Sequence, residues 1–316
     1  MSLQPLFRQF HDTIQLKNYN ENAELRQKRD TLLERLRDKL RPRTFEFFNQ
    51  GSYAMGTGVK PINRDYDYDI DIGIVFDVDY QQFDPVAVKG WVYQAVKGHT
   101  ASVDWRRPCI TVNYQQGGQP KYHVDLAVMA RDSRGTLRLA LGKEHSQADL
   151  RQWQVDDRQG FIKALENRFN GEEGYQFRRV IRYLKRWKDV HFSSEGRAAP
   201  TGLSLTIAAY NWFRPVRAQT QQGIVYDDLA ATAEFVNRLH QNFQNVWDAG
   251  LGRSSPRLSL QFPFAPKDDV FAPMSAQQMI EFRGRLEKLS GWLEEARKTQ
   301  SPASLQRAFG DPFPQK

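Results

Sequence analysis

A small set of residues has the types and the order that nucleotidyl transfer requires. Gly51 and Ser52 form a small-residue turn that can hold a triphosphate, and Asp69, Asp71 and Asp125 follow as candidate metal ligands. Such transfer uses two divalent ions about 3.5–4 Å apart, which activate the attacking hydroxyl and stabilise the leaving pyrophosphate. The fold must therefore bring Asp125 back to Asp69 and Asp71.

The segment from Asp65 to Phe76 predicts a β-strand, because its side chains alternate between acidic and apolar or aromatic with a period of two. Asp69 and Asp71 then share one face, about 6.6–6.8 Å apart along the strand, and can flank a pair of metal ions. Asp67 shares this face but is not expected to be a direct ligand. The opposite face is expected to enter an apolar core and carries Tyr68, Ile70, Ile72, Ile74 and Phe76.

A second strand pattern contains the third carboxylate. Residues 110–114 and 122–128 read as a hairpin joined by the Gly-containing turn 115–120. Asp125 alternates with Val124 and Leu126, so it faces away from the apolar set. Three carboxylates on neighbouring strands repel one another unless a cation lies between them. The structural alternative is an acidic, solvated strand that prevents aggregation, but the order and strand context of the motifs favour catalysis.

These motifs resemble the nucleotidyltransferase superfamily that includes DNA polymerase beta and poly(A) polymerase. More narrowly, they are similar to the cGAS/DncV-like nucleotidyltransferases of bacterial antiphage (CBASS) systems, with the Vibrio cyclic GMP-AMP synthase group fitting best. The resemblance extends over residues 182–189 and 199–205 and places Lys185 on the lysine that contacts the donor triphosphate. The family's Pro-Ser-Ser is here Pro200-Thr201-Gly202, so Thr201 keeps a hydroxyl and the second serine is lost.

The resemblance implies an α+β fold, in which a polymerase-beta-like nucleotidyltransferase lobe with a mixed sheet precedes a helical lobe. We expect the first lobe over residues 1–160, braced by a helix near its N-terminus, and the second over 161–316, with the nucleotide cleft between them. Apolar periodicity predicts helices at 22–40, 175–188, from 203, 227–247 and 275–298. In the helix at 175–188, the basic residues are expected to spread over the exposed surface, with Lys185 as the phosphate contact.

Composition agrees with an enzyme that binds polyanions. The formal net charge is +8, from 45 Lys and Arg against 37 Asp and Glu, which suits nucleotides and nucleic acids equally. The sole cysteine, Cys109, allows no intrachain disulfide and favours a cytoplasmic location. Charges interrupt the first 20 residues, so no signal peptide is expected. No apolar run approaches the ~20 residues that span a bilayer, so no membrane partner is expected.

We therefore expect a metal-dependent synthase that joins nucleoside triphosphates (ATP, with GTP or pyrimidine nucleotides as further candidates) into a cyclic di- or oligonucleotide messenger in antiphage defence. Two Mg²⁺ ions, which Mn²⁺ can replace, would bind Asp69, Asp71 and Asp125. Phosphate contacts are expected from Gln50, Gly51, Ser52, Lys185 and Thr201.

Two other functions remain open. The first is synthesis of linear oligonucleotides or addition to RNA ends, for which Trp105-Arg106-Arg107 is a small candidate platform, although an exposed turn explains it better. The second is a catalytically silent nucleotide-binding protein, which the intact carboxylates disfavour. The leading hypothesis requires no nucleic acid, and the motifs identify no regulatory protein or ligand.

Overall fold

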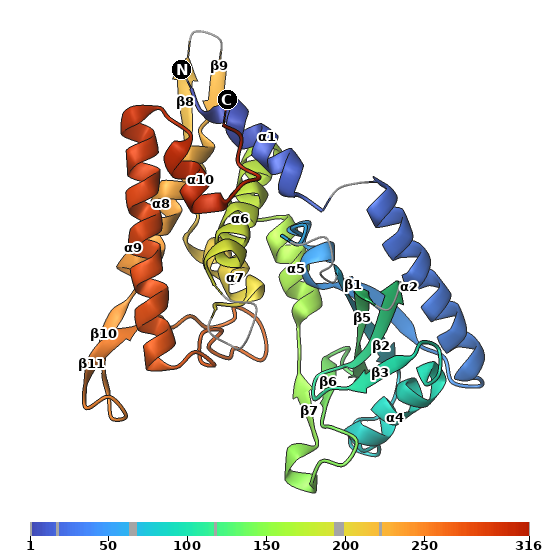
Figure 1. Cartoon of the computed structure of the whole chain (residues 1–316). Coiled ribbons are helices and arrows are strands. Elements are labelled where there is room, and N and C mark those ends of the chain that lie inside the picture. The colour runs from blue at the N-terminus through green and yellow to red at the C-terminus, as the bar shows by residue number, and fades with distance from the viewer. Residues whose placement is uncertain are drawn as a thin grey trace.

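A mixed sheet and a group of helices make up the computed structural model of the chain (Figure 1). The structure describes residues 2–16, 19–62, 68–116, 119–192, 199–220 and 223–315. The expected α+β class is confirmed. The strands of the main sheet are β1 (Glu46–Gln50), β2 (Tyr68–Phe76), β3 (Ser102–Trp105), β4 (Ile110–Gln116), β5 (Gln119–Arg131), β6 (Leu137–Leu141) and β7 (Gln152–Val155).

The sheet has the order β1-β2-β5-β4-β3, and β6 pairs with both β5 and β7. Strands β2 and β5 are parallel, whereas the other neighbours are antiparallel. The expected hairpin is present as β4 and β5, with residues 117–118 of its turn outside the described part. Asp67 also lies outside the described residues.

Two helices cover one face of this sheet. Helix α2 (Tyr19–Lys39) and α4 (Pro85–Val96) bury their apolar sides against Ile70, Ile72 and Ile74 of β2. The predicted leucine stripe of α2 is buried at Leu32, Leu33 and Leu36. Since β2 alternates with a period of two, burial of its isoleucines turns Asp69 and Asp71 to the opposite face.

The remaining helices share a second apolar core. Its centre is α6, whose Phe177, Tyr183 and Trp187 are fully buried. Helix α1 packs into this core too, with Phe7 and Phe10 against Tyr183, although it belongs to the first expected lobe by sequence. The boundary near residue 160 stays a prediction. These helices are α1 (Gln4–Ile14), α5 (Arg158–Glu166), α6 (Gly171–His191), α7 (Gly202–Trp212), α8 (Asp228–Gln241), α9 (Ala276–Thr299) and α10 (Ala303–Phe309).

The helix expected over 227–247 is too long. Helix α8 ends at Gln241, and Gln244–Asp248 forms strand β10, which pairs with β11 (Arg253–Arg257). Val246 and Trp247 favour a strand, and Gly252 adopts a positive φ of 61° in the hairpin's turn. A second hairpin joins β8 (Arg217–Thr220) to β9 (Gly223–Tyr226). Among the described helices, none has both the length and the apolar character needed to cross a membrane.

Candidate functional site

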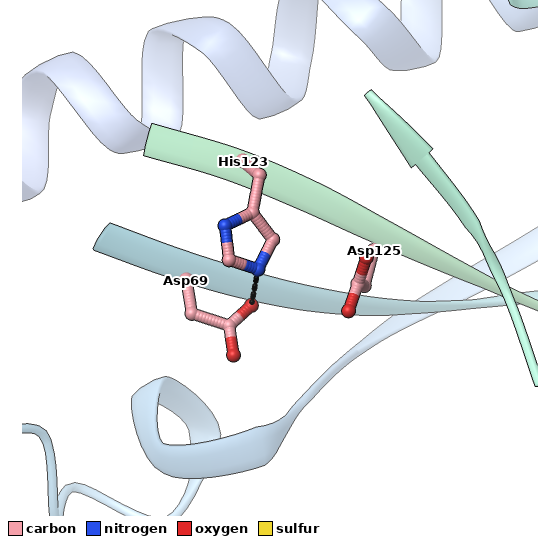
Figure 2. A group of neighbouring side chains, drawn as sticks. All are labelled: Asp69, His123 and Asp125. Atoms are coloured by element: carbon pink, nitrogen blue, oxygen red, sulfur yellow. Dashed lines mark ion pairs between the residues drawn. The ribbon is translucent and has the colours of Figure 1, made fainter. Parts of the chain in front are cut away.

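The parallel pairing of β2 and β5 brings the predicted acidic residues together. In its register Asp69 lies opposite His123, and Asp71 lies opposite Asp125. Because Asp69 and Asp71 are two residues apart, as are His123 and Asp125, all four side chains project from the same face. Figure 2 shows the side chains of Asp69, His123 and Asp125 gathered on one side of the two strands.

Three of these side chains offer a compact set of ligand atoms. One ligand atom each from Asp69, His123 and Asp125 lies within 4.8 Å of the others. His123 Nε2 is 3.2 Å from Asp69 Oδ1. Thr111 Oγ1 on β4 donates to Asp125 Oδ1 on the neighbouring strand β5 at 2.5 Å. This hydrogen bond fixes the orientation of the Asp125 carboxylate. The carboxylates are thus held in place by elements of the sheet.

Asp71 lies deeper, beneath the turn at Gly51. Burial, together with the nearby charges of Asp69 and Asp125, raises the pKa of the Asp71 carboxyl to about 7. Gly51 has a φ of +63°, and a Cβ there would lie 1.7 Å from Asp71 Oδ2. Glycine is therefore required at this position both for the backbone conformation and for space. The negative charge gathered here is costly to the fold without a cation.

A cavity of about 380 Å³ lies over Asp69 and Asp71. Helix α3 (Gly51–Ala54) and the neighbouring strand ends form one wall, and helices α5, α6 and α7 contribute to the other. The cavity combines carboxylates, cations and apolar side chains, as a site for a charged nucleotide should. Its lining residues are Gln50, Gly51, Ser52, Met55, Val59, Asp69, Asp71, Arg158, Phe161, Ile162, Lys185, Lys188, Asp189, Gly202, Leu203 and Phe262.

Lys185 reaches this cavity from α6 but is almost fully buried. Its Nζ donates to the carbonyl oxygen of Thr57 at 3.2 Å and to Thr57 Oγ1 at 3.1 Å. Burial, together with the positive charges of Lys188 and Arg182, lowers the pKa of Lys185 to about 7. An ammonium in this environment would gain strongly from a nearby phosphate.

The predicted phosphate contacts differ in position. Gly51, Ser52 and Lys185 line the cavity. Gln50 lines it too, but it is only 2% exposed and packs over Gly73, so it lies in the floor beside Asp71. Thr201 is not among the lining residues; its Oγ1 accepts from the backbone N–H of Ser204 at 3.0 Å and so caps α7. Asp125 is also outside the lining and joins the site through its register with Asp71.

Two residues of the site were not predicted from the sequence. His123 stands two residues before Asp125, and its position on the same strand face was the signal that could have identified it. Arg158 begins α5, lines the cavity, and its Nε lies 3.0 Å from Oδ2 of the buried Asp156. The charge of Arg158 lowers the pKa of Asp71. No local pattern indicated Arg158, because its place depends on the packing of α5 against the sheet.

The chemistry of these donors fits a divalent cation. Carboxylate oxygens are the ligands that Mg²⁺ and Mn²⁺ favour, and a cation between Asp69, Asp71 and Asp125 would offset their mutual repulsion. The raised pKa of Asp71 follows from its burial beside Asp69 and Asp125, and a bound cation would offset the charge of these carboxylates. Residues from β2 and β5 would therefore hold the metal, next to the Gly51 turn.

Comparison with known proteins identifies the central part of the chain. Residues 45–129 match the family model of the cyclic GMP-AMP synthase DncV-like nucleotidyltransferase domain. This stretch contains Gly51, Ser52 and all three predicted carboxylates, so the predicted nucleotidyltransferase domain is confirmed for residues 45–129.

Three solved structures share the fold of the chain. The CD-NTase CdnG of Bradyrhizobium diazoefficiens in complex with GTP has 18% identity and a TM-score of 0.76, and the match covers 98% of this chain and 96% of that chain. Vibrio cholerae DncV with nonhydrolyzable GTP has 19% identity and a TM-score of 0.66, and the match covers 88% of this chain and 72% of that chain. E. coli MS115-1 CdnC with ATP has 17% identity and a TM-score of 0.67, and the match covers 99% of each chain. At these identities the likeness establishes the fold; special kinship with the Vibrio group stays a prediction.

Proposed function

We propose that this protein, which carries a DncV-like nucleotidyltransferase domain at residues 45–129, is a metal-dependent synthase of a cyclic di- or oligonucleotide. Its substrates are nucleoside triphosphates, and pyrophosphate leaves at each transfer. The observation that carries the proposal is one cavity in which Asp69 and Asp71 lie beside the Gly51 turn and opposite Lys185. The resemblance to antiphage synthases supports a role for the product as a defence messenger.

The chain's own residues bind and orient the nucleotide. Backbone N–H groups at the start of α3, with the hydroxyl of Ser52, would receive the donor phosphates. Lys185 lies across the cavity and would add positive charge to the triphosphate. Arg158, held by Asp156, is a further cation on the same wall as Phe161 and Ile162. These cations and the apolar wall would align the reacting groups and limit access of water.

Asp69, Asp71 and Asp125 would hold two divalent ions, with Asp125 on the side of the acceptor. When bound, the ions lower the pKa of the attacking ribose hydroxyl and neutralise charge on the leaving pyrophosphate. Thr111 keeps Asp125 oriented through its hydrogen bond. A second transfer, after the linear intermediate turns around in the cavity, would close the ring.

The candidate RNA platform of the alternative function has a structural explanation. Trp105 Nε1 donates to the carbonyl oxygen of Gly142 at 3.0 Å. The backbone carbonyls of Arg106 and Arg107 accept from the buried ammonium of Lys89, at 2.7 and 2.9 Å. These bonds use the segment to close a turn against α4, so it adds nothing in favour of RNA as a substrate.

Mass spectrometry of the products made from all four nucleoside triphosphates tests the proposal. With Mg²⁺ or Mn²⁺ present, we expect a cyclic product that phosphatase leaves intact, whereas linear products would lose their terminal phosphates. The double variant Asp69→Asn, Asp71→Asn should stay folded and form no product. Asp77→Asn, an exposed carboxylate just beyond β2, is the matched control and should keep activity. Turnover by the double variant would refute the assignment.

A further inference from the structure

His123 lies among the carboxylates that the proposed mechanism uses, but nothing in that mechanism requires an imidazole. Its ring projects from β5 toward Asp69 on β2, on the same side as Asp125 (Figure 2). The side chain is largely buried, with 18% exposed, against 49% for Asp69. Its position is set by the sheet, because the parallel register places it directly opposite Asp69.

The separations within this group approach those of ligands around one ion. Neighbouring ligands of an octahedral cation are about 3 Å apart, and opposite ones about 4 Å, when each lies about 2.1 Å from the metal. His123 Nε2 is 3.2 Å from Asp69 Oδ1, and one ligand atom of Asp125 lies within 4.8 Å of both partners. An ion could therefore contact all three with small side-chain adjustments.

We propose that His123 is a nitrogen ligand of the metal site and makes this protein prefer a first-row transition ion such as Mn²⁺ over Mg²⁺. The inference rests on the proposed metal-dependent function and adds the choice of ion. Imidazole nitrogen binds transition ions better than it binds Mg²⁺, which favours oxygen ligands and dehydrates reluctantly. An Asp-His-Asp set therefore raises the affinity for Mn²⁺ more than the affinity for Mg²⁺.

A positioning role for His123 is the alternative. In that case the imidazole would orient Asp69 through the contact at 3.2 Å, and its loss would weaken all divalent ions alike. The two roles differ in whether nitrogen touches the ion. Convergence of His123 with Asp125 as well as with Asp69 favours direct ligation.

The test uses Mn²⁺ added to the full-length, metal-free protein. Electron paramagnetic resonance of the free ion gives the affinity for Mn²⁺, and competition gives the affinity for Mg²⁺. Pulsed measurements on the bound ion then detect ¹⁴N coupling from a coordinated imidazole. We expect this coupling in the wild type, and its loss in His123→Gln together with an about tenfold weaker affinity for Mn²⁺. The affinity for Mg²⁺ should change by no more than about threefold.

His145→Gln is the matched control, because its imidazole is 91% exposed and outside the cavity lining; it should leave both the affinity and the coupling unchanged. Absence of ¹⁴N coupling in the wild type would overturn the proposal without any need for a variant to fold. An equal loss of Mg²⁺ and Mn²⁺ affinity in His123→Gln would overturn it as well.

The failure of the metal site itself has a different signature. Asp125→Asn should weaken the binding of both ions. If Asp125→Asn and the wild type bound Mn²⁺ equally, the carboxylate site of the proposed function would be wrong. If Asp125→Asn lost binding while His123→Gln kept full Mn²⁺ affinity, only the assignment of His123 would be wrong.

Discussion

Charged side chains on the sheet wall and on the helical wall of the cleft have different surroundings. On the sheet wall, the charges of Asp69 and Asp125 act against that of Asp71 and raise its pKa. On α6, Arg182 donates to the carbonyls of Gly56 and Gly58 at 2.5 and 3.1 Å, and Arg186 donates to that of Lys60 at 2.6 Å.

The basic residues of α6 therefore act mainly in the fold. Arg182 and Arg186 hold the segment 56–60 that follows α3, and the buried Arg179 forms an ion pair with the buried Asp228. The expectation that these residues spread over an exposed surface is wrong for Arg179, Lys185 and Arg186, which are buried. The cause is that α8 and the segment 56–60 pack against this side of α6. Like charges gathered on the sheet oppose folding, whereas cations matched to fixed carbonyls support it. Function and stability are thus expected to separate between the two walls.

The largest difference between the effect on activity and the effect on stability is expected at Asp71. Replacing it by asparagine should reduce product formation by about a thousandfold or more, because a metal ligand is lost. When both proteins are free of metal at pH 8, the free energy of unfolding of the variant should nevertheless exceed that of the wild type by about 1 kcal/mol or more. Product formation and urea unfolding of the two proteins measure both effects.

The stabilisation expected from Asp71→Asn should depend on pH. Because the pKa of Asp71 is raised from 3.8 to about 7, the folded protein binds its proton more tightly than the unfolded chain does. Stability should therefore fall as the pH rises from about 4 to 7, and the advantage of Asp71→Asn should vanish at the acidic end. A variant less stable than the wild type at pH 8 would contradict this interpretation.

At Arg179 on α6 we expect a substitution to lower stability, in contrast to Asp71→Asn. Its side chain is 2% exposed, and Nε lies 2.7 Å from Oδ2 of the fully buried Asp228. Arg179→Met should lower the free energy of unfolding by about 3–5 kcal/mol, since Asp228 keeps a buried charge without its partner. Arg217→Met, which removes an exposed pair with Glu173, should cost at most about 1 kcal/mol. Urea unfolding compares them, and equal losses would contradict the distinction.

Gly51→Ala tests how closely the turn must approach the acidic wall. A Cβ would clash with Asp71 Oδ2, so the carboxylate must move, and activity should fall by about a hundredfold. Gly98→Ala is the matched control: its φ of +72° brings similar backbone strain, but a Cβ there meets nothing within 4 Å. Steady-state kinetics of the two variants check the prediction. Similar activity in both would mean that space beside Asp71 is unimportant.

The smallest effect is expected at Lys185, the cation of α6 that we assign to the nucleotide. Its pKa of about 7 leaves it mostly neutral at pH 8, and a bound triphosphate should raise that pKa. Binding of a nonhydrolysable nucleotide at pH 8 should then take up a fraction of a proton, up to about one. Calorimetry in buffers of different ionisation enthalpy measures this uptake. Equal uptake by Lys185→Met would assign the proton elsewhere.

The acidic site was predictable because a strand has a simple period. Alternation alone placed Asp69 and Asp71 on one face and turned Asp125 away from the apolar set. The parallel pairing of β2 with β5 is a contact between distant segments, and the sequence of neither strand predicts it. His123 was missed because its role appears only once that register places it opposite Asp69.

The helical part was predictable in outline only. Apolar periodicity identified α6, α7 and α9, but it could not tell which polar residues other segments would cover. Thr201 illustrates this limit, because its hydroxyl caps α7 and lies outside the cavity lining. In the sheet, one face is fixed by the core, whereas a basic helix surface depends on whatever packs against it.

A crystal grown with Mn²⁺ and a nonhydrolysable nucleoside triphosphate would locate the bound metal through its anomalous scattering, and so decide whether the three carboxylates bind it. We expect anomalous peaks between Asp69, Asp71 and Asp125, with the triphosphate against Gly51 and Ser52. Metal bound elsewhere, or a nucleotide that leaves these carboxylates without a cation, would contradict it.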